Sequence, residues 1–274
     1  MTSSPTIALA ATLHDPSGAL ATDIRRYLPR LAERYVQIAV ATSPPTARAI
    51  RRFLAREGAD AGTPVDNARG PLYRLALRRA LTKEPSHVHY LDFDRVLHWE
   101  ARRPRELAAT LRLVRRHRAI LLGRTRAAHC SHHRPLYATE VVTNALLAGH
   151  LGLDGRVDFL VPSFVLPAAA VRELLRRSRA RGNTVYGEWA ALVAGLAPEL
   201  AYLECRGLDW ETPDRHRRAV RRVGLAAWRR RQDTPAEWRA RTEMAADILR
   251  GVSRVLATGP VPKPALRRLA PRLG

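Results

Sequence analysis

The chain has 274 residues, of which 46% are hydrophobic, and a formal net charge of +22. This hydrophobic share can form a core, which excludes wholesale disorder, and no run of about 18 apolar residues predicts a membrane-spanning helix. The first residues lack the basic stretch of a signal peptide, and two cysteines cannot form a disulfide framework. We therefore expect a cytoplasmic protein of one large or two small domains.

The positive charge has two interpretations. A strongly basic chain is typical of proteins that bind nucleic acid, a membrane surface or anionic substrates. However, 45 of the 47 basic residues are arginine, and a GC-rich genome gives the same bias without any function. The sequence leaves both origins open. It contains no nucleic-acid recognition motif, so a nucleic-acid partner is disfavoured.

Short apolar runs alternate with amphipathic stretches along the first two thirds of the chain. The predicted strands are 7–13, 36–41, 87–91, 119–123, 157–161 and 200–205, and the predicted helices are 23–31, 46–57, 71–83, 106–117, 137–151 and 167–180. This alternation predicts an α/β fold with a mainly parallel sheet flanked by helices.

The character of the chain changes at residue 213. From there the sequence is helical, rich in arginine and contains tryptophan, and residues 259–264 are Pro-rich and predicted to be loose. We therefore expect a catalytic domain over 1–212, a helical extension over 213–258 and a Pro/Arg-rich tail over 259–274.

Two carboxylates follow the predicted strand 87–91 directly, in Asp92-Phe93-Asp94. Ligands of such sheets bind beyond the carboxyl ends of the strands. Hard cations such as Mg²⁺ and Mn²⁺ prefer oxygen ligands and often keep substrate phosphates as further ligands. The motif therefore predicts a site for Mn²⁺ or Mg²⁺, and its alternative interpretation is a solvated turn.

Further motifs place the aspartates in a family context. Arg69-Gly70 opens a predicted helix upstream, His89-Tyr90-Leu91 precedes the aspartates, and Tyr186-Gly187-Glu188-Trp189 follows later. Over roughly residues 6–210, this order resembles GT-A-fold glycosyltransferases, either family 2-like or mannosylglycerate-synthase-like members. The resemblance implies a GT-A-like sheet, a nucleotide diphosphate-sugar donor and a divalent cation.

The resemblance also implies roles for single residues. His14, Asp15 and Thr42 would lie near the nucleotide, and Arg69 near the diphosphate. Many members carry an acidic residue where this chain has Thr42, so the nucleotide is left open. Asp92 and Asp94 would bind the metal and sugar hydroxyls.

The resemblance implies one residue near the acceptor and one further metal ligand. Glu188 would act there as a base or as an orienting group, so Glu188 and Asp94 are the predicted catalytic residues. His216 would be a third metal ligand, as in mannosylglycerate-synthase-like members, or else an exposed histidine in an Arg-rich helix. Asp209 and Glu211 either face the acceptor or cap the helix that follows.

The arginines between 215 and 231 alternate with apolar residues at near-helical spacing. This pattern occurs in helices on an anionic membrane, and it is more typical of a helix that buries its apolar side on the sheet. Accordingly, the acceptor is open between a lipid-linked and a small molecule, and a peripheral position on the inner membrane face is open too.

The sequence as a whole predicts a glycosyltransferase. The alternatives are a basic protein that binds nucleic acid or anionic membrane without catalysis, and a nucleotidyltransferase, whose paired aspartates also bind metals. The donor sugar, the stereochemical outcome and the oligomeric state are not determined.

Overall fold

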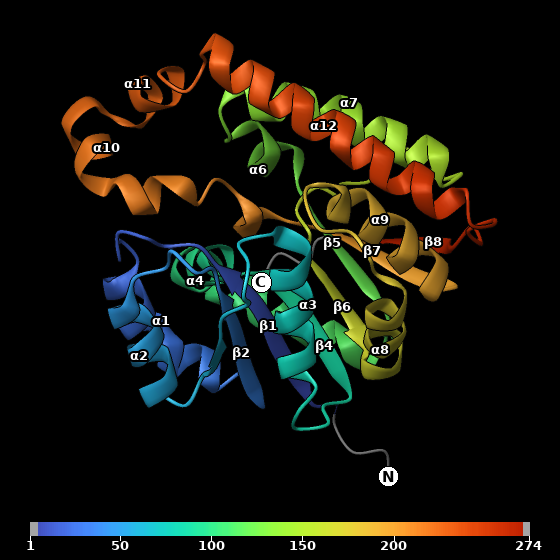
Figure 1. Cartoon of the computed structure of the whole chain (residues 1–274), viewed down its shortest axis with the longest axis horizontal. Coiled ribbons are helices and arrows are strands. Elements are labelled where there is room, and N and C mark those ends of the chain that lie inside the picture. Colours follow the sequence, from blue (N-terminus) through green and yellow to red (C-terminus); the bar gives the residue numbers. More distant parts are fainter. Residues whose placement is uncertain (1–4, 271–274) are drawn as a thin grey trace.

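The computed structural model describes residues 5–270. Two predictions concern residues that lie partly outside this range. They are the absence of a signal peptide at the first residues and the Pro/Arg-rich tail over 259–274. One eight-stranded sheet, in the order β3-β2-β1-β4-β6-β5-β7-β8, forms the centre of the molecule (Figure 1). The strands are β1 (Ile7–Leu13), β2 (Gln37–Thr42), β3 (Asp60–Gly62), β4 (His87–Asp92), β5 (Ile120–Arg124), β6 (Phe164–Pro167), β7 (Glu199–Cys205) and β8 (Ala265–Leu269).

Only β6 runs against its neighbours β4 and β5, so the predicted α/β fold with a mainly parallel sheet is confirmed. All seven residues of β1 are buried, because helices cover both faces of the sheet. Leu9 belongs to the core on one face and Ala10 to the core on the other. The helices of the first half are α1 (Ala21–Ala32), α2 (Arg48–Arg56), α3 (Arg69–Ala80), α4 (Phe93–Arg102) and α5 (Pro104–Arg112), which continues into the 3₁₀ turn η1 (Leu113–Arg115).

The second half contains α6 (Arg126–Cys130), α7 (Arg134–His150), α8 (Ala168–Arg177) and α9 (Thr184–Leu196). The predicted strand 157–161 is wrong: the strand that joins the sheet is β6, a few residues later. Helix α9 was not predicted. Its residues from Val185 to Ala194 are all buried, so the segment shows no amphipathic pattern from which a helix could be inferred.

The C-terminal segment arches over the carboxyl ends of the strands (Figure 1). It consists of the 3₁₀ turns η2 (Arg206–Leu208) and η3 (Thr212–His216), and of α10 (Arg217–Val223), α11 (Leu225–Arg230) and α12 (Pro235–Leu256). Helix α12 packs on α9 and α7. Gly187 and Gly251 permit this approach, because a Cβ atom on either would collide with the backbone of the other helix.

Residues 259–264 form neither helix nor strand. Residues 265–269 form β8, which pairs in parallel with β7 at the edge of the sheet. Among the described helices, none combines the length and the apolar character that crossing a membrane requires.

Candidate functional site

The two aspartates lie at the carboxyl edge of the sheet, where β4 passes directly into α4. Asp92 is the last residue of β4 and Phe93 the first of α4. The fully buried Phe93 ring anchors this junction in the core. Thr12 of β1 lies opposite Asp92 in the strand register, and its hydroxyl donates a 2.5 Å hydrogen bond to Asp92 Oδ1. The position of Asp92 is therefore fixed by the central strands.

Arginines surround the aspartates. Burial and the neighbouring charge of Asp94 raise the pKa of Asp92, and Arg95 and Thr12 oppose this shift. Arg95 Nε lies 3.9 Å from Asp92 Oδ2, and Arg215 forms an ion pair with Asp94. A second Arg215 nitrogen donates to the His14 carbonyl oxygen at 2.8 Å. The arginines thus partly neutralise two carboxylates that repel each other.

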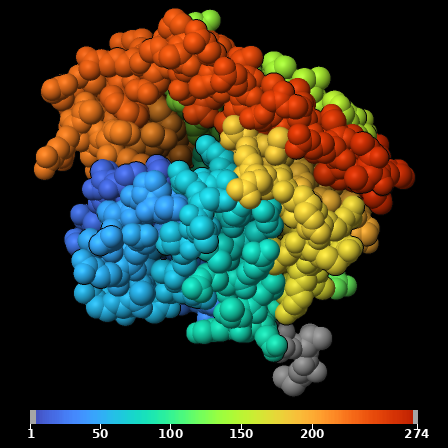
Figure 2. Space-filling model, in the orientation of Figure 1, coloured from blue at the N-terminus to red at the C-terminus, as the bar shows by residue number. Residues whose placement is uncertain are grey.

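A first cavity of about 430 Å³ opens beside the aspartates, and we call it the donor-side cavity. Its walls are the end of β1, the residue after β2, and the beginning of α3. Figure 2 shows a hollow between the orange C-terminal segment and the blue and cyan N-terminal half. The lining includes His14, Ser43, Asn67, Arg69, Tyr73, Asp92, Asp94 and Arg215.

Two of the four predicted nucleotide-side residues line this cavity. His14 pairs with Ser43 through Nδ1 at 2.7 Å, and burial together with Arg215 and Arg69 lowers its pKa. Arg69 donates to the Tyr186 hydroxyl at 2.7 Å, which fixes its guanidinium at the cavity wall.

The other two residues, Asp15 and Thr42, are not in the lining, and both are engaged in the fold. The Asp15 carboxylate accepts hydrogen bonds of 3.0 Å from the backbone N–H groups of Ala19 and Leu20, so it stabilises the turn before α1. The Thr42 hydroxyl contacts the Gly62 carbonyl oxygen at 3.2 Å, between β2 and β3.

A second cavity of about 410 Å³ lies on the other side of the aspartates, and we call it the acceptor-side cavity. It shares Arg69, Asp92, Asp94 and Arg215 with the donor-side cavity. Its other walls come from the loop before α7, from α7, α9 and α12, and from Trp210 and Glu211. These four shared residues form the boundary between the two cavities.

Glu188 does not face the aspartates. It lies on the lining of a separate groove between α9 and α12. Its carboxylate accepts hydrogen bonds from the Ser178 hydroxyl (2.5 Å) and from the backbone N–H groups of Arg179 (2.6 Å) and Ala180 (2.9 Å). This arrangement fits a structural role in the loop between α8 and α9, and the geometry does not bring Glu188 to the predicted catalytic position.

His216 also lies apart from the aspartates. Its ring is exposed and packs on Trp228 at 5.3 Å. In the described part of the chain, no group of three or more His, Cys, Asp or Glu side chains is arranged to hold a metal ion. The donor set at the site is therefore the two carboxylates of Asp92 and Asp94, which suits a hard cation that takes its other ligands from substrate phosphates and water.

Three further groups at the site were not predicted as site residues. Tyr186 receives the hydrogen bond from Arg69 and a second one from the Tyr73 hydroxyl at 2.9 Å. Arg95 lies one helical turn after Asp92, a spacing that the sequence shows. Arg215 is one of many arginines between residues 215 and 231, so the sequence does not distinguish it from its neighbours.

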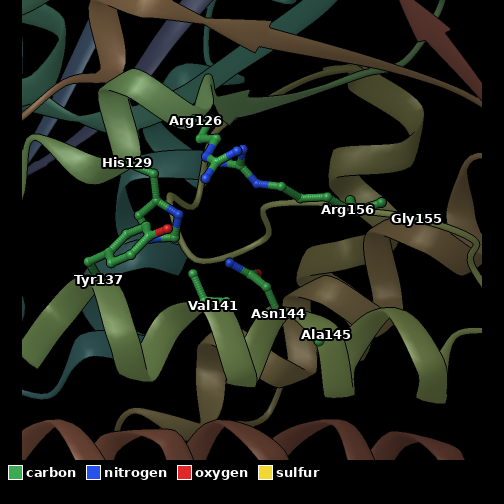
Figure 3. Close-up of a pocket in the computed structure, with 9 residues that line it drawn as sticks. Arg126, His129, Tyr137, Val141, Asn144, Ala145, Gly155 and Arg156 are labelled. Carbon is green, nitrogen blue, oxygen red and sulfur yellow. The ribbon is translucent and has the colours of Figure 1, made fainter.

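A third cavity of about 440 Å³ lies between α6, α7 and the loop before Val157 (Figure 3). His129 lines this third cavity, and its Nε2 lies 3.2 Å from a carboxylate oxygen of Glu140. Glu140 in turn lines the acceptor-side cavity. Glu140 also accepts a hydrogen bond of 2.5 Å from the fully buried Arg124, which donates a second one of 2.7 Å to Asp158. This buried network separates the third cavity from the site.

Comparison with known proteins shows the fold. No protein-family model and no curated protein sequence matches the chain. Among solved structures, mannosyl-3-phosphoglycerate synthase from Rubrobacter xylanophilus matches with a TM-score of 0.54 and 18% identity. The match covers 96% of this chain and 78% of that protein. The chain has a GT-A-like fold.

Structures of glucosyl-3-phosphoglycerate synthase from Mycobacterium tuberculosis are less similar. The one in complex with Mn²⁺, uridine diphosphate and phosphoglyceric acid has a TM-score of 0.47 and 17% identity, over 84% of this chain and 80% of that one. Another structure of this enzyme has a TM-score of 0.44 and 18% identity. The match covers 69% of this chain and 65% of that one. The GT-A-like fold agrees with the resemblance found in the sequence.

Proposed function

We propose that the protein is a glycosyltransferase that takes a sugar from a nucleotide diphosphate-sugar, with Mn²⁺ or Mg²⁺ at Asp92 and Asp94. The observation that carries this proposal is the position of the two aspartates, with Arg69, at the boundary between two cavities of a GT-A-like fold. A group-transfer enzyme needs such a boundary, because donor and acceptor must meet at one place.

The donor fits the donor-side cavity. A planar guanidinium binds phosphate oxygens through two hydrogen bonds, and Arg69 presents one where the diphosphate would enter. The Asn67 and Ser43 side chains line the same wall and offer hydrogen bonds to a nucleoside. Thus the nucleotide lies between β1, β2 and α3, and the sugar lies at the aspartates.

The aspartates suit a divalent cation. Burial, and after it the charge of Asp94, raise the pKa of Asp92, and a bound cation would offset both by stabilising the two carboxylates. When bound, the cation stabilises the charge that develops on the departing diphosphate. Arg69 and Arg215 both line the donor-side cavity, where their guanidinium groups would bind the diphosphate. The acceptor hydroxyl approaches from the acceptor-side cavity, which reaches the same aspartates.

Calorimetric titration with UDP- and GDP-sugars in the presence of Mn²⁺ tests the proposal. At least one nucleotide-sugar should bind to the wild-type protein, and Asp92→Asn and Asp94→Asn should each weaken its binding at least tenfold. Asp154→Asn, at a fully exposed carboxylate, is the matched control and should bind like wild type. Binding of no nucleotide-sugar, or unchanged binding in both aspartate variants, would refute the proposal.

A further inference from the structure

The acceptor-side cavity is not basic, although the chain carries a net charge of +22. Its described lining contains five carboxylates (Asp92, Asp94, Glu140, Glu211 and Glu237) and four arginines (Arg69, Arg95, Arg215 and Arg241). The proposed cation would add two positive charges at Asp92 and Asp94, but the diphosphate of the donor brings two negative charges with it. With the donor bound, the lining therefore has no surplus of positive charge for an anionic acceptor.

The arginines of this lining are already matched by carboxylates. Arg241 donates to Glu237 at 2.7 Å, and Arg215 is paired with Asp94. Arg95 Nη1 lies 3.3 Å from Glu211 Oε2. Arg69 and Arg215 also line the donor-side cavity, where the diphosphate of the donor engages them once a cation has replaced Arg215 at Asp94. A carboxylate or phosphate on the acceptor would therefore have to break an existing ion pair or compete with the diphosphate.

His132, which is buried at the same lining, carries a hydrogen-bond acceptor without a partner. Burial and nearby arginines lower the pKa of His132 well below its usual value, so the ring is neutral. Its Nδ1 lies 3.1 Å from the Ala128 carbonyl oxygen, which can only accept, so Nδ1 carries the hydrogen. The other nitrogen, Nε2, has a free lone pair and no hydrogen-bond partner. A hydroxyl group can donate to it, whereas an ionised phosphate or carboxylate cannot.

Arg95 and Glu211 leave one donor and one acceptor without a hydrogen bond. Their 3.3 Å contact lacks hydrogen-bond geometry, so Arg95 Nη1 and Glu211 Oε2 both remain unsatisfied. Glu211 is 7% exposed, and a polar atom left without a hydrogen bond at such a buried position is unfavourable. A hydroxyl group both donates and accepts, and it therefore matches this mixed set of atoms.

Trp210 is 7% exposed, and its exposed part adds a small apolar surface to the lining. The centre of its ring lies 5.0 Å from that of Trp228 and 5.7 Å from that of His133, and these two rings hold it in place. An aromatic side chain offers apolar contact area to the C–H groups of a ring-shaped ligand, and it offers little to a compact anion.

We propose that the acceptor is an uncharged polyhydroxylated molecule, a sugar, glycoside or polyol, that binds between Trp210, Glu211 and His132. This inference rests on the proposed function and narrows its acceptor. The proposed acceptor differs in charge from the phosphoglycerate that the names of the similar structures contain.

The first test compares acceptors. The protein, saturated with Mn²⁺ and the nucleotide-sugar that binds in calorimetry, is incubated with glycerol, methyl glucoside, methyl mannoside, trehalose or 3-phosphoglycerate, and products are identified by mass spectrometry. A glycosylated neutral compound is expected, with transfer to 3-phosphoglycerate at least tenfold slower. Equal or faster transfer to 3-phosphoglycerate, or no transfer to any neutral compound, would overturn the inference. Because donor binding is measured separately, failure of the proposed function is distinguished from failure of the acceptor class.

The second test locates the acceptor. Glu211→Gln keeps the shape of the side chain, and Trp210→Ala removes the apolar surface. Each is expected to raise the KM for the neutral acceptor at least tenfold while leaving the Kd of the nucleotide-sugar within twofold of wild type. Trp238→Ala, which alters a tryptophan outside the lining, is the control and should keep the wild-type KM. An unchanged acceptor KM in both test variants would remove the acceptor from this cavity.

Discussion

Arg215 and Asp94, 121 residues apart in the chain, form an ion pair at the boundary of the two cavities. This pair connects the C-terminal segment to the predicted metal site, and Arg215 also bonds the His14 carbonyl oxygen. A cation that binds Asp94 must therefore compete with a guanidinium that is already there.

This competition predicts the effect of Arg215→Ala. Removal of a positive charge beside Asp94 should strengthen binding of Mn²⁺ alone by about three- to tenfold, on the order of 1 kcal/mol. The same variant should weaken binding of the nucleotide-sugar, because Arg215 also lines the donor-side cavity. Electron paramagnetic resonance of free Mn²⁺ and calorimetry measure the two effects. Arg218→Ala, at an exposed arginine of α10, is the control, and weaker Mn²⁺ binding in Arg215→Ala would contradict the prediction.

Arg69→Lys tests the phosphate contact. Lysine keeps the charge but loses the two-pronged geometry and the hydrogen bond to Tyr186. We expect the Kd of the nucleotide-sugar to rise about tenfold, which corresponds to about 1.4 kcal/mol, with no change in the Kd of a free nucleoside. Arg176→Lys on the exposed side of α8 should change neither value. Equal losses for nucleotide-sugar and nucleoside would show that Arg69 acts on something other than the diphosphate.

Glu188→Gln distinguishes structure from catalysis at the position that the family resemblance marked. Loss of the charge weakens three hydrogen bonds to the loop between α8 and α9, so the free energy of unfolding should fall by about 1–3 kcal/mol. The kcat of the folded variant should stay within threefold of wild type. Denaturant titration and steady-state kinetics provide the measurements, with Glu57→Gln at an exposed pair as the control. A hundredfold loss of kcat with unchanged stability would return Glu188 to the catalytic site.

The stability of the protein should depend on His98. Burial by itself would lower the pKa of His98, but hydrogen bonds and charges from Asp209 (3.0 Å) and Asp214 (2.6 Å) outweigh it and raise the pKa to about 9. A folded-state pKa above the usual 6.5 means that this stabilisation is complete below pH 6.5 and is lost as the pH rises through 9. We expect the free energy of unfolding to fall by an amount on the order of 3 kcal/mol across this window.

Chemical denaturation at pH values from 6 to 10 measures this dependence. His98→Gln should be less stable at pH 6 and should lose much of the slope, whereas His150→Gln, at an exposed histidine, should keep it. A slope that survives in His98→Gln would assign the pH dependence to other groups. Because His98 ties α4 to the segment that carries Glu211, the same variant should also raise the acceptor KM.

Several features of the fold could be predicted from local patterns. Strand β1 and strand β4 are buried on both faces and read as continuous apolar runs, and the two aspartates follow β4 directly. In contrast, β6 was misplaced and α9 was missed, because α9 is buried on nearly all sides and shows no helical periodicity. Strand β8 follows a Pro-rich stretch and is only five residues long, so nothing local distinguishes it from a loop.

The sequence by itself determined the alternation of strands and helices, and the position of Asp92, Asp94 and Arg69 near the carboxyl edge of the sheet. These features depend on apolar periodicity and on neighbouring residues in the chain. Only the tertiary structure decided which side chains meet there. It brought Arg215 to Asp94 and Glu211 to Arg95, and it turned Glu188 toward a loop, because the partner of a polar side chain depends on how distant segments pack and not on its neighbours in the chain.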